Sequence, residues 1–223
     1  LVVVGTGVAG LTAALRARRQ GLRVLVINKG ALSESTTRWA QGGIAAVRHE
    51  RDSGDSVRRH AADTMTAGAG LCSTEAVREI VRGGARAIDV LHAAGAQFDL
   101  DEHGLLSRTR EGGHSAFRVV HAGGDATGAE VQRALSQTAD IEGVPLLERH
   151  CVADLLRGDS GAIAGVVALD AQSRPGVVRA PAVLLATGGL GQLFAATTNP
   201  ELVTGDGIAL ALRAGASIAD LEF

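Results

Sequence analysis

Short apolar runs and glycines alternate at the start of the chain. Residues 1–4 are Leu-Val-Val-Val, and because three of these side chains are β-branched, the run favours a buried strand. Glycines follow directly, and Leu11–Gln20 then carries apolar residues at helical spacing. Gly21 is suited to end that helix, and Leu22–Ile27 forms a second apolar run. The pattern predicts a strand, a helix and a parallel strand, the order of a mononucleotide-binding β-α-β unit.

The rest of the chain continues this alternation of helical and strand patterns. Four segments have helical spacing: Asp52–Ala67, Glu75–Ala94, Ala129–Asp140 and Ile208–Ala214. We expect Ser53 or Asp55 to cap the first of these helices and Ser73 or Thr74 to cap the second. Short strands are expected at Pro145–Glu148, Val152–Leu156 and Val183–Ala186, with a hairpin over 162–178 and a turn or hairpin over 98–110. The order predicts one α/β domain over residues 1–223, with a central parallel sheet, helices on both faces and a small antiparallel β element.

The composition is that of a globular protein, since 46% of the residues are hydrophobic and 21% are charged. A net charge of −2 gives no reason to expect nucleic acid or an anionic membrane surface as a partner. No run approaches the length of about 18 apolar residues that a membrane-spanning helix needs. Cys72 and Cys151 lie far apart, without the spacing of a metal site or a redox pair. They indicate reduced thiols in a cytoplasmic protein.

Gly5, Gly7 and Gly10 give the spacing G-x-G-x-x-G between the first strand and the first helix. In this context the spacing predicts a Rossmann-like dinucleotide-binding turn. The first glycine allows a tight turn, the second lets a pyrophosphate approach the backbone, and the third lets helix and strand pack closely. A purely structural glycine turn in another kind of α/β protein is the alternative.

The end of the second strand departs from an ordinary NAD-binding domain. Such domains place Asp or Glu there to hold the ribose hydroxyls, whereas this chain has Asn28 and Lys29. Lys29 can donate to ribose or phosphate oxygens but accepts no hydrogen bond. The residue therefore weighs against an NAD(P)-dependent dehydrogenase.

Further polar loops are candidates for ligand contacts. Ser33–Gly43 is rich in hydroxyls and ends in Gly-Gly, so its groups could donate to phosphate or flavin-ring oxygens. Alternatively, its hydroxyls cap a helix over Arg38–Ala46. A second glycine cluster, Thr187–Gly191, stands at the carboxyl end of a predicted strand, where ligands of open α/β sheets bind. Asp206 either caps the last helix or accepts from a ligand hydroxyl.

The segment Thr109–Ser115 places a carboxylate, Glu111, and an imidazole, His114, beside two glycines. It is too polar to belong to a core, and loops of this kind often carry function. An active-site loop and a solvated turn both remain open on this evidence. The helix residues His60 and His92 receive no role.

Several motifs in order resemble the succinate dehydrogenase/fumarate reductase flavoprotein family. They are the opening glycine turn, Lys29, Ala40-Gln41-Gly42-Gly43 and Ala186-Thr187-Gly188-Gly189. Three more motifs, Arg110–Ser115, His121–Gly128 and Thr197–Pro200, are similar to the L-aspartate oxidase branch of that family. The resemblance covers nearly the whole chain.

The resemblance implies an FAD-binding domain whose capping domain and C-terminal part lie outside this chain. It implies oxidation of L-aspartate to iminoaspartate, with oxygen or fumarate as electron acceptor, as the first step of NAD biosynthesis. A transient contact with quinolinate synthase and a cytoplasmic location would follow. These 223 residues alone are expected to be inactive. The alternatives are a fumarate reductase or succinate dehydrogenase-type flavoprotein, and a non-catalytic nucleotide-binding fragment.

The resemblance also carries roles to individual residues. Glu111 matches a residue that orients the substrate by meeting its amino group, as an ammonium beside a carboxylate would. Thr36 stands where relatives with covalent FAD have His, so the flavin is expected to be noncovalent. The residues expected to contact FAD are Gly5, Thr6, Gly7, Val8, Ala9, Gly10, Lys29, Thr36, Thr37, Arg38, Trp39, Ala40, Gln41, Gly42, Gly43, Val152, Ala186, Thr187, Gly188 and Asp206. Val152 would meet adenine through its backbone, and no metal is expected.

Overall fold

The computed structural model describes residues 1–48 and 54–221. The chain folds into two compact units. The first unit comprises Leu1–Trp39 and Leu135–Phe223, and the second comprises Ala40–Ala134. The first unit is therefore built from two separate stretches of chain, with the second unit between them in sequence.

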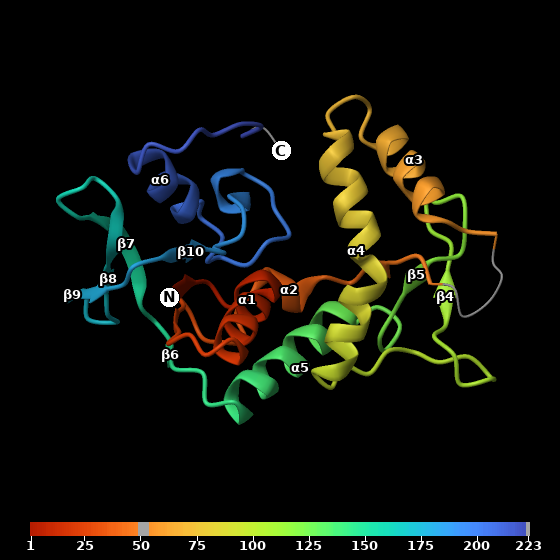
Figure 1. Cartoon of the computed structure of the whole chain (residues 1–223), viewed down its shortest axis with the longest axis horizontal. Coiled ribbons are helices and arrows are strands. Elements are labelled where there is room, and N and C mark those ends of the chain that lie inside the picture. Colours follow the sequence, from red (N-terminus) through yellow and green to blue (C-terminus); the bar gives the residue numbers. More distant parts are fainter. Residues whose placement is uncertain (49–53, 222–223) are drawn as a thin grey trace. The chain divides into compact units, whose positions relative to one another are not determined.

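The first unit contains the predicted parallel sheet (Figure 1). Its strands are β1 (Val2–Val4), β2 (Leu25–Ile27), β6 (Leu146–Leu147) and β10 (Val183–Leu185), in the order β10-β1-β2-β6. Every pairing in this sheet is parallel, and β1 lies between β10 and β2. The prediction of a central parallel sheet is confirmed.

Helix α1 (Val8–Arg19) connects β1 to β2, and both of its ends differ from the predicted boundaries. It begins at Val8, three residues before Leu11, so Gly10 belongs to the helix. The second strand begins at Leu25 instead of Leu22, because the N–H of Leu22 donates to Ala17 O and so closes the helix. Gly21 follows the helix with φ +83°, as expected of a glycine that ends a helix.

Two separate hydrophobic clusters cover the two faces of the sheet. Val3 and Val26 pack with Ala14 and Ala17 of α1. The opposite side of β1 packs in a cluster with side chains from β7 (Cys151–Arg157), β8 (Ile163–Leu169) and α6 (Asp206–Arg213). Alternation of side chains along β1 therefore buries both faces, which explains its uninterrupted apolar sequence.

The antiparallel element of the first unit is a three-stranded sheet in the order β7-β8-β9. β9 covers Pro175–Arg179, and a register shift between Val152 and Asp154 interrupts the β7–β8 pairing. The predicted hairpin over 162–178 corresponds to β8 and β9. A 3₁₀ turn, η1 (Gly191–Leu193), lies between β10 and α6.

The second unit contains a small antiparallel sheet and two helices. Its strands are β3 (Ile44–Ala45), β5 (Val119–Val120) and β4 (Arg108–Thr109), paired in that order, and its helices are α3 (Val57–Ala67) and α4 (Thr74–Ala93). The alternative of a helix over Arg38–Ala46 is wrong: α2 covers only Thr36–Trp39, and the chain then enters β3. Helix α5 (Thr127–Ile141) begins in the second unit. The bridge between Leu100 and Leu106 confirms a turn in the 98–110 region.

The helix caps of the second unit follow the sequence only in part. Ser73 caps α4 by accepting a hydrogen bond from the N–H of Ala76, as predicted. Helix α3 begins at Val57 and is capped by Ser56, so the prediction for Asp55 is wrong, and Ser53 lies outside the described residues. Asp55 is unavailable as a cap because its carboxylate binds Arg118. Over the described residues, no helix is both long and apolar enough to cross a bilayer.

Candidate functional site

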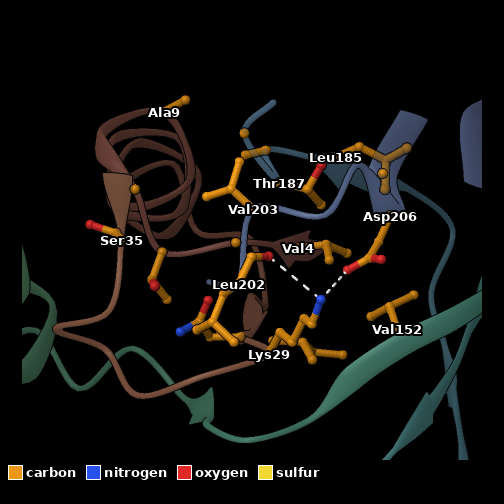
Figure 2. A pocket seen from close by; sticks show the side chains of 18 of the residues that line it. Val4, Ala9, Lys29, Ser35, Val152, Leu185, Thr187, Leu202, Val203 and Asp206 are labelled. Atoms are coloured by element: carbon orange, nitrogen blue, oxygen red, sulfur yellow. Dashed lines mark hydrogen bonds and ion pairs between the residues drawn. The ribbon is translucent and has the colours of Figure 1, made fainter. Parts of the chain in front are cut away.

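A cavity of about 470 Å³ lies along the carboxyl edge of the parallel sheet in the first unit (Figure 2). The turns after β1, β2 and β10 line it together with the start of β7 and the N-terminus of α6. This edge is the position at which ligands of open α/β sheets bind. The sheet therefore presents a ligand-sized cavity where the glycine turn predicted one.

Most of the residues predicted to contact a dinucleotide line this cavity. They are Gly5, Thr6, Gly7, Val8, Ala9, Lys29, Thr36, Thr37, Val152, Ala186, Thr187, Gly188 and Asp206. Gly10 is absent from the lining because it lies under the turn, where an added Cβ would collide with the carbonyl of Gly5. Arg38 and Trp39 are also outside the lining, and Trp39 is 65% exposed. Ala40, Gln41, Gly42, Gly43 and Glu111 belong to the second unit.

Sequence reasoning missed other lining residues. His150 and Cys151 precede Val152 at the start of β7, so their position at a strand end was a signal that could have found them. Leu202 and Val203 are apolar residues of an irregular loop, and their sequence carries no such signal. Glu34 and Ser35 lie within the predicted polar loop but were not singled out.

The glycine turn has the geometry that its sequence requires. Gly5 has φ +110°, and its N–H donates to Ile27 O at 2.8 Å, which ties the turn to β2. A side chain on Gly5 would collide with the carbonyl of Ala186, so only glycine allows β1 and β10 to meet here. Gly7 caps α1 without a side chain, and the N–H of Val8 donates to Thr37 Oγ1 at 2.9 Å.

Lys29 and Asp206 form an ion pair at the cavity wall, with 2.7 Å between Nζ and Oδ2 (Figure 2). Lys29 also donates to Thr204 Oγ1 at 2.6 Å, and the Thr204 hydroxyl donates to Asp206 Oδ1. From the sequence, Lys29 and Asp206 were expected to contact a ligand separately. The structure instead joins the end of β2 to the N-terminus of α6 through these three side chains.

Cys151 lines the cavity beside this ion pair. Burial raises the pKa of its thiol, the charge of Asp206 raises it further, and Lys29 opposes the shift. The thiol is therefore neutral near pH 7. A neutral thiol is a poor nucleophile.

In the second unit, Glu111 pairs with His121, with 2.8 Å between Oε1 and Nε2. The carboxylate side chain is 46% exposed, whereas the imidazole is 17% exposed. Thr109 Oγ1 lies 3.0 Å from the same ring nitrogen, and Gly124 O lies 3.1 Å from Nδ1. Glu111 therefore reaches solvent from a position that its contact with His121 fixes.

Arg118 is completely buried in the second unit and binds two carboxylates. It donates twice to Asp55, at 2.9 and 2.7 Å, and once to Asp63 at 2.6 Å. The hydrogen bond from Arg118 and the N–H of Ser115 hold the pKa of Asp63 well below its usual range. Burial raises the pKa of Asp55, but the hydrogen bonds from Arg118 and the Ser56 N–H outweigh it and lower that pKa. The charge of Arg118 is thus neutralised by Asp55 and Asp63 inside the second unit.

His60 and His114 lie beside this cluster. Arg118 Nη1 donates to His114 Nδ1 at 3.1 Å, and the two imidazole centroids are 5.6 Å apart. Burial lowers the pKa of His60, and the neighbouring Arg118 lowers it further. No group of three or more potential metal ligands was found among residues 1–48 and 54–221.

Comparison with known proteins decides what this arrangement is. The whole chain, residues 1–223, matches the family described as "FAD binding domain". The chain belongs to the FAD binding domain family. An FAD binding domain accounts for the glycine turn and for the cavity at the carboxyl edge of the sheet. The comparison thus favours a dinucleotide site over a purely structural turn.

Relatives of this FAD binding domain include enzymes named L-aspartate oxidase. The chain is 53% identical to the one from Streptomyces coelicolor and 52% identical to the one from Mycobacterium tuberculosis. All of the chain is aligned in both cases, but it covers only 39% and 41% of those proteins. The chain therefore spans about two fifths of the length of these relatives.

Solved structures share the fold of this chain. Sdh1 of Mycobacterium smegmatis matches 96% of the chain with a TM-score of 0.89 and 35% identity, over 37% of its own length. The E. coli quinol fumarate reductase subunit FrdA matches 95% of the chain with a TM-score of 0.88 and 32% identity, over 36% of its length. The α/β fold predicted from the sequence is confirmed.

Proposed function

We propose that this chain is the FAD-binding part of a longer flavoprotein that oxidises L-aspartate to iminoaspartate. The observation that carries the proposal is its identity of 51–53% to L-aspartate oxidases along its whole length. A half-exposed carboxylate at Glu111 supports it, because a substrate with an amino group calls for such a partner. Oxygen or fumarate would accept the electrons.

The glycine turn suits the pyrophosphate of FAD. Backbone N–H groups at the N-terminus of α1 attract anions, and no acidic side chain stands in the first turn of that helix. Gly7 lacks a Cβ, so a phosphate can approach the backbone of residues 5–9 closely. Gly10 would act indirectly, by letting the helix pack beneath the turn.

The opposite wall of the cavity suits the adenosine part of FAD. The Asp206 carboxylate can accept from a ribose hydroxyl, and Lys29 balances its charge. The backbone of Val152, at the start of β7, would meet adenine. Ala186, Thr187 and Gly188 would contact FAD from the turn after β10.

The segment from Thr36 to Gly43 would contact the flavin end. Thr36 and Thr37 line the cavity, and Arg38, Trp39, Ala40, Gln41, Gly42 and Gly43 follow in sequence. Because a threonine side chain cannot make a histidyl bond, the flavin would be noncovalent.

Bound FAD would supply the chemistry, by accepting a hydride from the substrate Cα. The contribution of this chain is to orient the substrate: the Glu111 carboxylate would hold the ammonium group of L-aspartate. Succinate and fumarate have no such group, so Glu111 would distinguish an amino acid from a simple dicarboxylate.

The wider roles follow from this activity. Iminoaspartate is a reactive product, so a transient contact with quinolinate synthase would pass it on toward NAD biosynthesis in the cytoplasm. Neither a nucleic acid nor a membrane is part of the proposal. The chain taken alone, without the rest of the protein, would be inactive.

The full-length protein tests this proposal directly. Acid precipitation should release yellow flavin into the supernatant, which would establish both the cofactor and its noncovalent attachment. L-aspartate should then yield hydrogen peroxide in air, and succinate should not replace it. Oxidation of succinate without turnover of L-aspartate would overturn the proposal.

The structural similarity to Sdh1 and FrdA favours one alternative, a dicarboxylate dehydrogenase. The comparison of L-aspartate with succinate as substrates decides between an L-aspartate oxidase and a dicarboxylate dehydrogenase. A non-catalytic nucleotide-binding fragment is the other alternative, and turnover of L-aspartate by the purified 223-residue chain would exclude it.

A further inference from the structure

We infer that His121 is a positioning residue for Glu111: its imidazole holds the carboxylate in the orientation that receives the substrate ammonium. The inference rests on the proposed function, because it gives Glu111 its ligand. It concerns a residue that itself touches neither substrate nor cofactor in this scheme.

The partners of the imidazole fix its position. Gly124 O faces Nδ1 at 3.1 Å, and a carbonyl can only accept, so Nδ1 carries a proton. Glu111 Oε1 faces Nε2 at 2.8 Å. The carboxylate therefore lies within hydrogen-bond distance of the ring nitrogen.

A third polar neighbour, Thr109, lies against the same ring nitrogen. Thr109 Oγ1 is 3.0 Å from Nε2 and 3.5 Å from Val119 O. Polar partners therefore face both nitrogens of His121 and hold the ring in place.

The backbone around His121 is itself fixed. Asp99 accepts hydrogen bonds from the N–H groups of Gly123 and Gly124, at 2.9 and 3.1 Å. Both glycines have positive φ, 58° and 72°, which turns the chain so that Gly124 O meets the ring. The N–H of Asp99 donates to His121 O at 2.8 Å. Asp99 thus connects the Gly123–Gly124 turn to His121, whose ring the turn orients.

Gly43 closes the other side of the imidazole. A Cβ at this position would lie 2.9 Å from His121 Cε1 and 2.5 Å from Val120 O. The segment proposed to contact the flavin therefore packs against the imidazole that holds the Glu111 carboxylate. Glycine is required here because the ring and β5 occupy the space of a side chain.

This arrangement leaves one carboxylate oxygen for the substrate. Glu111 Oε1 is held by His121, while Oε2 has no hydrogen-bond partner among the described residues. The imidazole is the more buried of the two side chains, so it holds the carboxylate from the side that faces away from solvent. A charge-assisted hydrogen bond of this kind is stronger and shorter than a neutral one.

Steady-state kinetics of the FAD-loaded full-length protein test the inference with H121F, H121Q, E111Q and H121F/E111Q. We expect H121F to raise the KM for L-aspartate about tenfold, the effect of losing one charge-assisted hydrogen bond, with kcat changed much less. H121Q keeps a neutral N–H donor and should recover most of that loss. The KM for fumarate should change less than about twofold.

The double variant separates positioning from general structural damage. If His121 acts through Glu111, H121F should raise the KM for L-aspartate no further in the E111Q background. His103 offers a matched control, since it also faces a carboxylate, Glu102, at 3.5 Å, but is exposed. H103F should behave like the wild type. If H121F does not fold, as judged by flavin content, H121Q and H121Q/E111Q give the same comparison.

Three results would overturn the inference: an unchanged KM for L-aspartate in H121F, equal losses for L-aspartate and fumarate, or additive effects in the double variant. Failure of the proposed function has a different signature, because the wild type would then not oxidise L-aspartate at all. When the wild type is active and E111Q binds L-aspartate weakly, the His121 variants test positioning alone.

Discussion

Lys29 and Asp206 are 177 residues apart in the sequence, and their charged groups lie 2.7 Å apart at the cavity wall. The pair fixes the end of β2 against the start of α6. Both side chains are partly exposed, so the pair contributes little to overall stability, on the order of 1 kcal/mol or less. Its effect is local: Lys29, at the end of β2, holds the Asp206 carboxylate in place at the cavity wall.

K29A should therefore weaken flavin binding much more than it lowers thermal stability. We expect about a fivefold or greater loss of affinity, because Asp206 would be left without its counter-charge beside an anionic cofactor. The ratio of flavin to protein after gel filtration measures this. Arg19 and Glu142 form a control ion pair at 2.6 Å in the same unit, outside the cavity lining. Equal flavin loss in K29A and R19A would contradict the local role of Lys29.

G10A should destabilise the first unit and abolish flavin binding. The added methyl would collide with the carbonyl of Gly5, and the cost of such overpacking is about 1–3 kcal/mol. Thermal unfolding followed by circular dichroism measures the change. G83A is the matched control, because Gly83 lies inside α4 with no atom within 4 Å of its Cβ position, and the change should stabilise that helix by up to about 1 kcal/mol.

G43A should weaken the binding of L-aspartate. The new Cβ would press on Val120 O and on the His121 ring, so we expect a loss of about 1–3 kcal/mol in stability and a higher KM for L-aspartate. The KM for fumarate should rise less. G42A is the neighbouring control, since nothing lies within 4 Å of its Cβ position. Similar kinetics for G42A and G43A would argue against the contact between Gly43 and His121.

E111Q should weaken L-aspartate binding by about tenfold or more, because an amide lacks the charge that pairs with an ammonium group. Fumarate reduction by the same variant should be less affected. The comparison needs only steady-state assays of the full-length protein with each substrate. Equal losses for both substrates would refute the proposed contact with the amino group.

The cluster around Arg118 predicts a pH dependence of stability. The pKa values of Asp55 and Asp63 are lowered in the folded state from the ordinary value of 3.8. Between the folded and unfolded pKa values, the unfolded chain binds more protons, so stability rises with pH there. The stabilisation is therefore fully present above about pH 5 and is lost as the pH falls below 4.

D63N tests this directly. It should cost about 1–3 kcal/mol at pH 7, because Arg118 would lose a charge-assisted hydrogen bond but keep its pair with Asp55. It should also reduce the loss of stability between pH 5 and pH 3. Urea unfolding at several pH values gives both quantities. Asp89 is the control, since its carboxylate side chain is 65% exposed in the ion pair with Arg48, and D89N should change stability by less than about 1 kcal/mol.

Local patterns in the sequence predicted much of this molecule. The strand, glycine turn and helix of the first 20 residues follow from β-branching, glycine spacing and helical periodicity, which act over short stretches of chain. Ser73 was identified as a cap for the same reason. These features need only neighbours in sequence, so the sequence contains all the information that they require.

Other features depend on partners far away in the chain. From local sequence Asp55 could cap α3. In the fold its carboxylate binds Arg118, 63 residues later, and Ser56 caps the helix instead. The pairing of Lys29 with Asp206 is of the same kind. His121 was visible as part of a motif, but its relation to Glu111 depends on how two loops fold together. Periodicity cannot predict such contacts.

The position of the second unit in the sequence, between two stretches of the first, has a consequence for synthesis of the protein. Strand β1 is synthesised long before its partner β10, which follows only at Val183–Leu185. At typical rates of about 5–20 residues per second, the interval is on the order of ten seconds or longer. During that time the apolar edge of β1 has no partner on one side. We therefore expect the nascent chain to depend on chaperones or on early folding of residues 40–134.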